Sequence, residues 1–165
     1  MKVERILAIA PHFIGEVKSI VYTLDGKVEC EETPKQLIEQ FCLREFSTKE
    51  GRKQAVKKLF GYEKKIPILI QPCEIGAFPT TSSKDPNCCY IFQHPFHMKE
   101  KEKGRMALRL LNGERLEVYA SRYSLRQQSY KLQHILMTCR YLMKEELGSL
   151  TYSLKFDKTL SEWMK

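Results

Sequence analysis

The chain has 165 residues, 42% of them hydrophobic, which suffices for one packed core and argues against both a disordered chain and a second ordinary domain. No apolar run approaches the roughly 18 residues of a membrane span, and the apolar segment 5–10 is too short for a signal peptide, so we expect a soluble cytoplasmic protein without a membrane partner. The 28 Lys and Arg residues outnumber the 20 Asp and Glu residues, and the net charge of +8 favours an anionic partner such as nucleic acid.

The chain opens with strand signals. Residues 5–10 are apolar, and residues 18–32 resemble a hairpin around a Gly-containing turn. A three-residue loop over residues 24–26 pairs Tyr22 with Val28 and leaves one face of the hairpin apolar. A two-residue turn at residues 25 and 26 would instead place apolar and charged side chains on the same face. We therefore predict the three-residue loop.

Two helices are predicted next. Thr33 and Gln36 have the spacing of a capping box at the start of a helix over 34–46. A second, shorter helix is predicted over 49–60, and Gly61 is expected to end it in the left-handed conformation.

The second half predicts more strands and a long helix. Strand patterns occur at 66–70, 90–92 and 106–119. In the last of these, a three-residue loop with Gly113 at a bulge pairs Leu108 with Leu116. The run 99–105 alternates basic residues with Glu and is expected to be a solvated loop. The fold class is therefore α+β: a mainly antiparallel sheet built from hairpins, packed with an N-terminal helix and a long C-terminal helix. It forms one domain over 1–165, with 149–165 as a possible tail.

The C-terminal helix, predicted over 123–147, carries an unusual charge pattern. Between 122 and 144 the sequence has five Lys or Arg residues and no Asp or Glu. At about 100° per residue, the polar positions fall in a stripe about 60° wide: Arg122, Arg126, Ser129, Gln133, Arg140 and Lys144. An ordinary exposed helix mixes both signs of charge, so the uniform sign favours a bound polyanion over a merely solvated face.

A second basic cluster lies on the shorter helix and just after it, at Lys49, Arg52, Lys53, Lys57, Lys58, Lys64 and Lys65. These residues are candidates for phosphate contacts. Lys57 and Lys58 fit an ordinary exposed surface equally well.

Catalytic motifs are missing from the sequence, which has no G-x-S-x-G, no nucleotide-binding glycine loop and no H-E-x-x-H. The six cysteines include no C-x-x-C pair and are predicted to be reduced thiols. Cys88 and Cys89 precede His94 and His97, but adjacent sulfurs are not a spacing that zinc sites commonly use. We therefore predict no enzyme, no metal and no cofactor.

Several short motifs occur in a specific order in the middle of the chain. They are Gly51-Arg52-Lys53, then Pro67-Ile68, then Phe78-Pro79-Thr80-Thr81-Ser82-Ser83 with Pro86 and Cys88, and finally the Asn112-Gly113 hairpin and Tyr123 before the Arg-bearing helix. In this order they make residues 50–140 resemble the ComK family of bacterial competence transcription factors.

The resemblance implies an activator of DNA-uptake genes that binds double-stranded promoter DNA at A-rich and T-rich half-sites, largely through the minor groove. It also implies a homo-oligomer, a dimer or a tetramer, and a C-terminal tail recognised by a proteolytic adaptor. Because A·T tracts have a narrow, electronegative minor groove, Arg52 and Lys53 become candidates to enter it. The hydroxyls at 80–83, which are Thr80, Thr81, Ser82 and Ser83, become candidates to bind phosphate oxygens, although a structural turn explains them equally well.

Three alternatives remain open. The chain could be a module for RNA or single-stranded nucleic acid that stacks bases on exposed Tyr or Phe. It could be a metal-dependent nucleic-acid enzyme built on Cys88, Cys89, His94 and His97. It could also bind only a protein partner.

Overall fold

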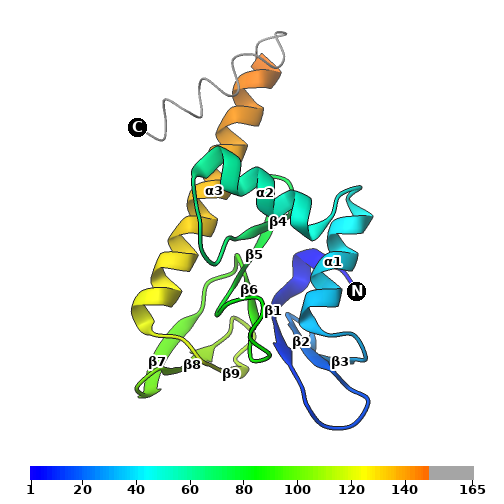
Figure 1. The fold of residues 1–165 in the computed structure, drawn as a ribbon, viewed down its shortest axis with the longest axis vertical. Helices are drawn as coiled ribbons and strands as arrows, with labels where there is room; N and C mark the ends of the chain where they lie inside the picture. The colour runs from blue at the N-terminus through cyan, green and yellow to red at the C-terminus, as the bar shows by residue number, and fades with distance from the viewer. Residues whose placement is uncertain (149–165) are drawn as a thin grey trace.

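In the computed structural model, which describes residues 1–148 and their side chains as far as 145, a six-stranded antiparallel sheet lies at the centre (Figure 1). Its strand order is β3-β2-β1-β6-β5-β4. The strands are β1 (Ile6–Pro11), β2 (Ser19–Thr23), β3 (Gly26–Cys30), β4 (Ile68–Gln71), β5 (Ile75–Pro79) and β6 (Tyr90–Phe92). A short 3-10 helix, Val3–Arg5, precedes them. The central strands β1 and β6 are buried almost throughout, so both faces of this sheet are covered.

Helix α1 (Pro34–Arg44) covers one face of the sheet. Its Leu37, Ile38 and Phe41 share an apolar cluster with Ile9 of β1. Helix α2 (Lys49–Phe60) follows α1 directly, and its Val56 packs against Ile135. This contact joins α2 to the long C-terminal helix, because Ile135 belongs to the latter.

Helix α3 (Arg122–Gly148) covers the other face together with a second, three-stranded antiparallel sheet (Figure 1). The strands of this second sheet are β7 (His97–Glu102), β8 (Arg105–Arg109) and β9 (Arg115–Val118). Leu125 and Leu132 of α3 share one buried cluster with Leu7 of β1 and Met106 of β8. The two covered faces confirm the predicted α+β class.

The local helix and turn signals in the sequence form the expected contacts. Gln36 N donates to Thr33 Oγ1 at 3.3 Å, and Thr33 N donates to Gln36 Oε1 at 2.9 Å, which completes the capping box. Helix α2 has its predicted bounds, and Gly61 ends it with φ of 71°. The β8–β9 hairpin pairs Leu108 with Leu116 as predicted, and Gly113 has φ of 86°. Helix α1 ends at Arg44, two residues earlier than expected.

The first hairpin was predicted with the wrong register. Strand β2 pairs Val21 with Val28 and Thr23 with Gly26, so the turn contains only Leu24 and Asp25. Thr23 Oγ1 stabilises this turn by donating to Gly26 O at 2.9 Å and accepting from the Asp25 amide at 3.1 Å. Apolar pairing did not decide the register because β3 is an edge strand and Val28 is 41% exposed.

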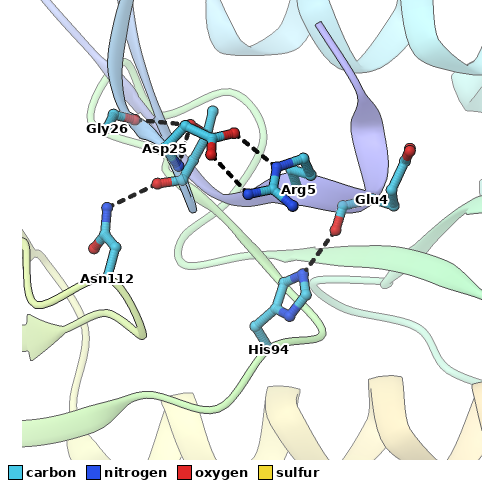
Figure 2. A network of polar contacts seen from close by, with 7 residues as sticks. Glu4, Arg5, Asp25, Gly26, His94 and Asn112 are labelled. Atoms are coloured by element: carbon cyan, nitrogen blue, oxygen red, sulfur yellow. Dashed lines mark hydrogen bonds and ion pairs between the residues drawn. The ribbon is translucent and has the colours of Figure 1, made fainter.

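Contacts outside the hairpin also fix that turn (Figure 2). Arg5 donates to both carboxylate oxygens of Asp25 at 2.7 Å, and Asn112 Nδ2 donates to the Thr23 carbonyl at 2.8 Å. The Asn112 contact joins the β8–β9 loop to the β2–β3 hairpin. Residues far apart in the sequence therefore select the shorter turn.

Two strands were missed by the sequence analysis. The run expected to be a solvated loop forms β7, an exposed edge strand on which charged side chains are well tolerated. The segment Ile75–Pro79 forms β5, which is buried throughout and so lacks the alternation of a half-exposed strand.

The expectation of six reduced thiols is wrong for one pair. Cys73, in the turn between β4 and β5, forms a disulfide with Cys139 of α3 across 66 residues of sequence. Cys30, Cys42, Cys88 and Cys89 are free. The pairing has no sequence signal because only the packing of α3 on β5 brings the two residues together. The possible tail at 149–165 lies outside the described residues.

Candidate nucleic-acid interface

The basic stripe, the six residues at 122, 126, 129, 133, 140 and 144, lies on one side of α3. Its charged members Arg122, Arg126, Arg140 and Lys144 are all exposed. None of the ion pairs found among residues 1–145 involves them. The stripe therefore presents four cations without an internal carboxylate partner in the part of the chain that the structure describes.

Polar contacts hold one edge of the stripe against the body of the protein. Gln133 Nε2 donates to the Gln93 carbonyl at 3.2 Å, and Arg140 Nε donates to the Cys73 carbonyl at 2.6 Å. Arg126 and Gln133 also line a depression of about 350 Å³ formed with the 93–98 segment. The stripe is thus positioned by fixed neighbours, while Arg122, Arg126 and Lys144 remain available to a ligand.

A second basic surface forms from three separate segments of the chain. It is a depression of about 390 Å³, which we name the lysine cleft, and it is lined by Lys49, Lys53, Lys64, Lys65, Lys84, Ser82, Ser83, Ile66 and Glu63. Helix α2, the loop after α2 and the loop after β5 supply these residues. The fold thereby gathers five lysines and two serine hydroxyls around one carboxylate.

Helix α3 holds both loops of the lysine cleft through a buried amide. Gln128 is 2% exposed, and its Nε2 donates to the Lys65 carbonyl at 2.5 Å and to the Pro79 carbonyl at 3.3 Å. Lys131 Nζ donates to the Lys64 carbonyl at 3.3 Å, and Lys65 Nζ donates to Ser124 Oγ at 2.9 Å. The cleft loops are therefore fixed to the helix that carries the basic stripe.

Burial and nearby like charges make it less favourable for lysines in and beside the lysine cleft to remain protonated. Desolvation lowers the pKa of Lys49, and the nearby charges of Lys35 and Lys53 lower it further. The pKa of Lys131 is lowered by desolvation and then by Lys65. An anion in the cleft would relieve this repulsion and favour the protonated lysines.

The predicted hydroxyl cluster divides between the protein interior and the lysine cleft. Thr80 is 1% exposed, and its Oγ1 accepts a hydrogen bond from the Cys89 amide at 3.0 Å. Thr81 Oγ1 donates to the Ser82 carbonyl at 3.4 Å. Only Ser82 and Ser83 of the four line the cleft. The buried end of this segment thus has a structural role, and its exposed end can meet a ligand.

The predicted basic residues of α2 also differ in their surroundings. Lys53 lines the lysine cleft. Arg52 is half-buried, with Nη2 donating to the Glu45 carbonyl at 3.2 Å. Lys57 is exposed and pairs with Glu63, with 3.5 Å between Nζ and Oε2. Of these three, Lys53 is the residue that the fold places beside Ser82 and Ser83.

The basic stripe and the lysine cleft lie on opposite flanks of α3. At about 100° per residue, the stripe lies roughly half a turn from Ser124 and Lys131, which contact the loop of the lysine cleft at Lys64 and Lys65. Between them runs an exposed line of side chains that we name the tyrosine ridge: Tyr123, Tyr130, Met137 and Tyr141, which are 74%, 64%, 65% and 43% exposed. A ligand on one basic surface must extend around α3 to reach the other.

Sequence reasoning did not identify Gln128 or Lys84 as parts of this surface. Gln128 lies within the apolar arc of α3, and a polar residue there is a usable signal because buried polar groups need partners. Lys84 has no comparable local signal, since only the return of the chain after β5 brings it beside α2. The tyrosine ridge was not identified either, although the spacing of 123, 130 and 137 by seven residues is a usable signal for it.

The residues of the metal-site alternative, which the sequence analysis left open, do not form such a site in the described part of the chain. Cys88 and Cys89 are buried, and burial raises the pKa of both thiols, that of Cys89 to about 12. His94 contacts the Glu4 carbonyl at 3.2 Å (Figure 2), whereas His97 is exposed on β7. No three His, Cys, Asp or Glu side chains converge within residues 1–145.

Comparisons with known proteins agree with the family resemblance that the sequence analysis based on the order of short motifs. The family model described as ComK protein matches residues 3–144, which includes every strand and nearly all of α3. A competence transcription factor of Bacillus subtilis (strain 168) is 28% identical over 128 residues, which cover 76% of this chain and 67% of that protein. No solved structure shows significant similarity. Within residues 1–148, no helix combines the length and the apolar character that crossing a bilayer requires. By the extent of the family match, the chain belongs to the ComK family of competence transcription factors.

Proposed function

We propose that this protein activates competence genes in the cytoplasm by binding double-stranded promoter DNA through the lysine cleft and the basic stripe. The observation that carries the proposal is the cleft, where five lysines from three segments surround Ser82 and Ser83 with Glu63 as the one lining carboxylate. Such a concentration of positive charge is typical of phosphate-backbone contacts. The stripe adds further exposed cations on the other flank of α3, and none of them belongs to an ion pair found among residues 1–145.

The proposed contacts fall into two kinds. Ser82, Ser83 and the exposed Arg122, Arg126 and Lys144 bind phosphate oxygens and set the position of the duplex. Lys53 and Arg52 enter a narrow A·T-rich minor groove, whose negative potential attracts cations. Lys53 is the better placed, because Arg52 must first release the Glu45 carbonyl. Thr80 supports the site from within, and Arg140 and Gln133 fix the stripe in place.

The remaining features of the proposal rest on family membership. We propose that the protein binds as a homo-oligomer, a dimer or a tetramer, because paired half-sites are matched by repeated subunits. We also propose that residues 149–165 are recognised by a proteolytic adaptor. Lys57, paired with Glu63, lies at the edge of the cleft and is available to a phosphate once that ion pair opens.

One observation favours a second candidate, binding of single-stranded nucleic acid. The tyrosine ridge lies between two basic surfaces, and exposed aromatic rings flanked by cations are how many proteins stack unpaired bases. Duplex DNA remains the first candidate because the family is one of transcription factors.

The deciding experiment is a fluorescence-anisotropy titration with three probes of equal length: an A·T-tract duplex, a G·C-rich duplex and a single strand. We expect the A·T-tract duplex to bind most tightly, with a logarithmic salt slope of about −0.9 per phosphate neutralised. Tighter binding of the single strand would replace the first candidate by the second. The triple variant K53Q/K64Q/K65Q should lose binding, while K2Q, at an exposed residue distant in sequence, should not.

A further inference from the structure

The outer face of the second sheet carries three cations and a histidine that the proposed interface does not include. The register pairs His97 with Arg109 and Arg109 with Arg115, so the three side chains stand in one row across β7, β8 and β9. Lys99 lies two residues along β7 on the same face. We name these four residues the arginine corner. They line a depression of about 650 Å³, and each of them is exposed.

The basic residues of this sheet face differ in whether a carboxylate pairs with them. Glu117 accepts from Lys101 Nζ at 2.5 Å and from Arg105 Nη2 at 2.6 Å, and Arg105 Nη1 also donates to Glu102 at 2.7 Å. Glu117 shares a row with Lys99 and also lines the depression. None of the ion pairs or side-chain hydrogen bonds found in the described residues nevertheless involves a member of the arginine corner.

Direct pairing of Arg109 with Arg115 is unfavourable for the sheet itself. Like charges opposite each other on neighbouring strands destabilise a sheet, and exposure to water only reduces this effect. The pattern is therefore not explained by folding stability. An external anion between the two guanidinium groups would relieve this repulsion.

The arginine corner continues the surface already proposed to bind DNA. Met98 of β7 lines the depression at the corner and also the depression that contains Arg126 and Gln133 of the basic stripe. Met98 pairs with Leu108, so its side chain lies on the inner face of β7 and the two depressions meet across this edge strand. A phosphate backbone that leaves the stripe can therefore reach the corner around the edge of β7. Guanidinium groups suit this ligand, because their planar fork binds phosphate oxygens in a bidentate manner.

We propose that the arginine corner binds the phosphate backbone of the duplex and extends the DNA interface from α3 onto the three-stranded sheet. The inference rests on the proposed function, since it requires that the protein bind DNA. It assigns the corner a charge-based, sequence-independent contact. The rigid sheet presents Arg109 and Arg115 with their backbones fixed by the β8–β9 ladder.

The test is the double variant R109Q/R115Q, titrated with the A·T-tract duplex at several salt concentrations. Loss of two phosphate contacts should reduce the salt slope by about 2 and weaken binding by about tenfold near physiological salt. The loss should be equal on A·T-rich and G·C-rich duplexes. The matched control K2Q/K18Q removes the same net charge from exposed lysines distant in sequence, and should leave the slope unchanged.

A charge-conserving variant and a folding control complete the test. R109K/R115K should keep the salt slope of the wild type, because lysine retains the charge. R109Q/R115Q should melt no lower than the wild type, because the substitution removes a repulsion. If R109Q/R115Q keeps the salt slope of the wild type while K53Q/K64Q/K65Q abolishes binding, the arginine corner does not contact DNA. That result would overturn this inference and leave the proposed function standing. Failure of the wild-type protein to bind any duplex would overturn the proposed function as well.

Discussion

Gln128 Nε2 of α3 donates a hydrogen bond to the carbonyl oxygen of Lys65, at a position where the Gln128 side chain is almost completely buried. The same nitrogen also reaches the Pro79 carbonyl. Lys65 belongs to the loop after α2, and Pro79 ends the strand that leads to Ser82 and Ser83. One amide thus joins the long helix to the two loops of the lysine cleft.

Replacing this amide should affect both stability and DNA binding. In Gln128→Leu the side chain keeps a similar size, but the Lys65 and Pro79 carbonyls lose their donor in a buried site. We expect the free energy of unfolding to fall by about 2 kcal/mol, measured by urea denaturation, because buried polar groups without a partner are costly. The loosened loops should also weaken duplex binding.

Gln127→Leu is the matched control for this prediction, because Gln127 is the exposed neighbour on the same helix. It should change the free energy of unfolding by less than about 0.5 kcal/mol, as surface substitutions usually do. Equal stability of Gln127→Leu and Gln128→Leu would show that the buried hydrogen bonds contribute nothing.

The parts of the fold that follow from the sequence are those fixed by nearby residues. The capping box at Thr33 and the left-handed glycines at 61 and 113 depend on a few neighbouring positions, and the structure has each of them. The β2–β3 register depends instead on Arg5 and Asn112, which are distant in sequence. Long-range contacts of that kind leave no local pattern.

The same distinction applies to the candidate site. The basic stripe was visible because all of its residues lie on one helix, where a fixed angle per residue relates them. The lysine cleft needs the topology that brings α2 beside the loop after β5, so the sequence could name Lys53 and Ser82 but not their proximity. The arginine corner could not be predicted, because its alignment depends on the register of β7, a segment that had been expected to be a loop.

Phosphate contacts and groove contacts should respond differently to substitution. Arg122→Gln and Arg126→Gln should each reduce the salt slope by about 1. Each should lower the affinity for A·T-rich and G·C-rich duplexes equally, because the phosphates are the same in both. Arg52→Gln and Lys53→Gln should mainly reduce the preference for the A·T-rich duplex. Anisotropy titrations with both duplexes measure the salt slope and the preference for the A·T-rich duplex of each variant. Equal loss on both duplexes for Lys53→Gln would remove that residue from the groove.

The Cys73–Cys139 disulfide should stabilise the oxidised protein substantially. It spans 66 residues, and the chain-entropy relation assigns a loop of that length about 4 kcal/mol at 25 °C. Cys139→Ser should therefore lower the melting temperature of protein kept without reductant, whereas it should change little in protein kept reduced. Cys30→Ser, at a free and half-buried cysteine, is the control. Six titratable thiols in unreduced, unfolded protein would contradict the pairing.

The Arg5–Asp25 pair predicts a pH effect on stability. Hydrogen bonding from Arg5 lowers the pKa of the Asp25 carboxyl below its ordinary value. A carboxyl with a lowered pKa in the folded state stabilises the protein above its unfolded pKa, and this contribution is lost as the pH falls through the folded pKa. Asp25→Asn should therefore melt slightly lower than the wild type at pH 7. The two melting curves should begin to converge as the pH falls below about 4, the ordinary pKa of Asp, and should meet only below the lowered pKa of the folded state. A difference that is independent of pH would point to turn geometry instead.

The segment 80–83 offers a final test that separates structure from binding. Thr80 Oγ1 accepts from the buried Cys89 amide, so Thr80→Val should cost about 1 to 3 kcal/mol of unfolding free energy by leaving that donor without its side-chain partner. Ser82 is exposed and lines the lysine cleft, and its Oγ accepts only a long hydrogen bond from the Lys84 amide at 3.4 Å, so Ser82→Ala should change stability little and weaken duplex binding a few-fold. Urea denaturation and anisotropy measured on both variants resolve the two roles. If Ser82→Ala binds DNA like the wild type, its hydroxyl makes no phosphate contact, and the segment is a structural turn along its whole length.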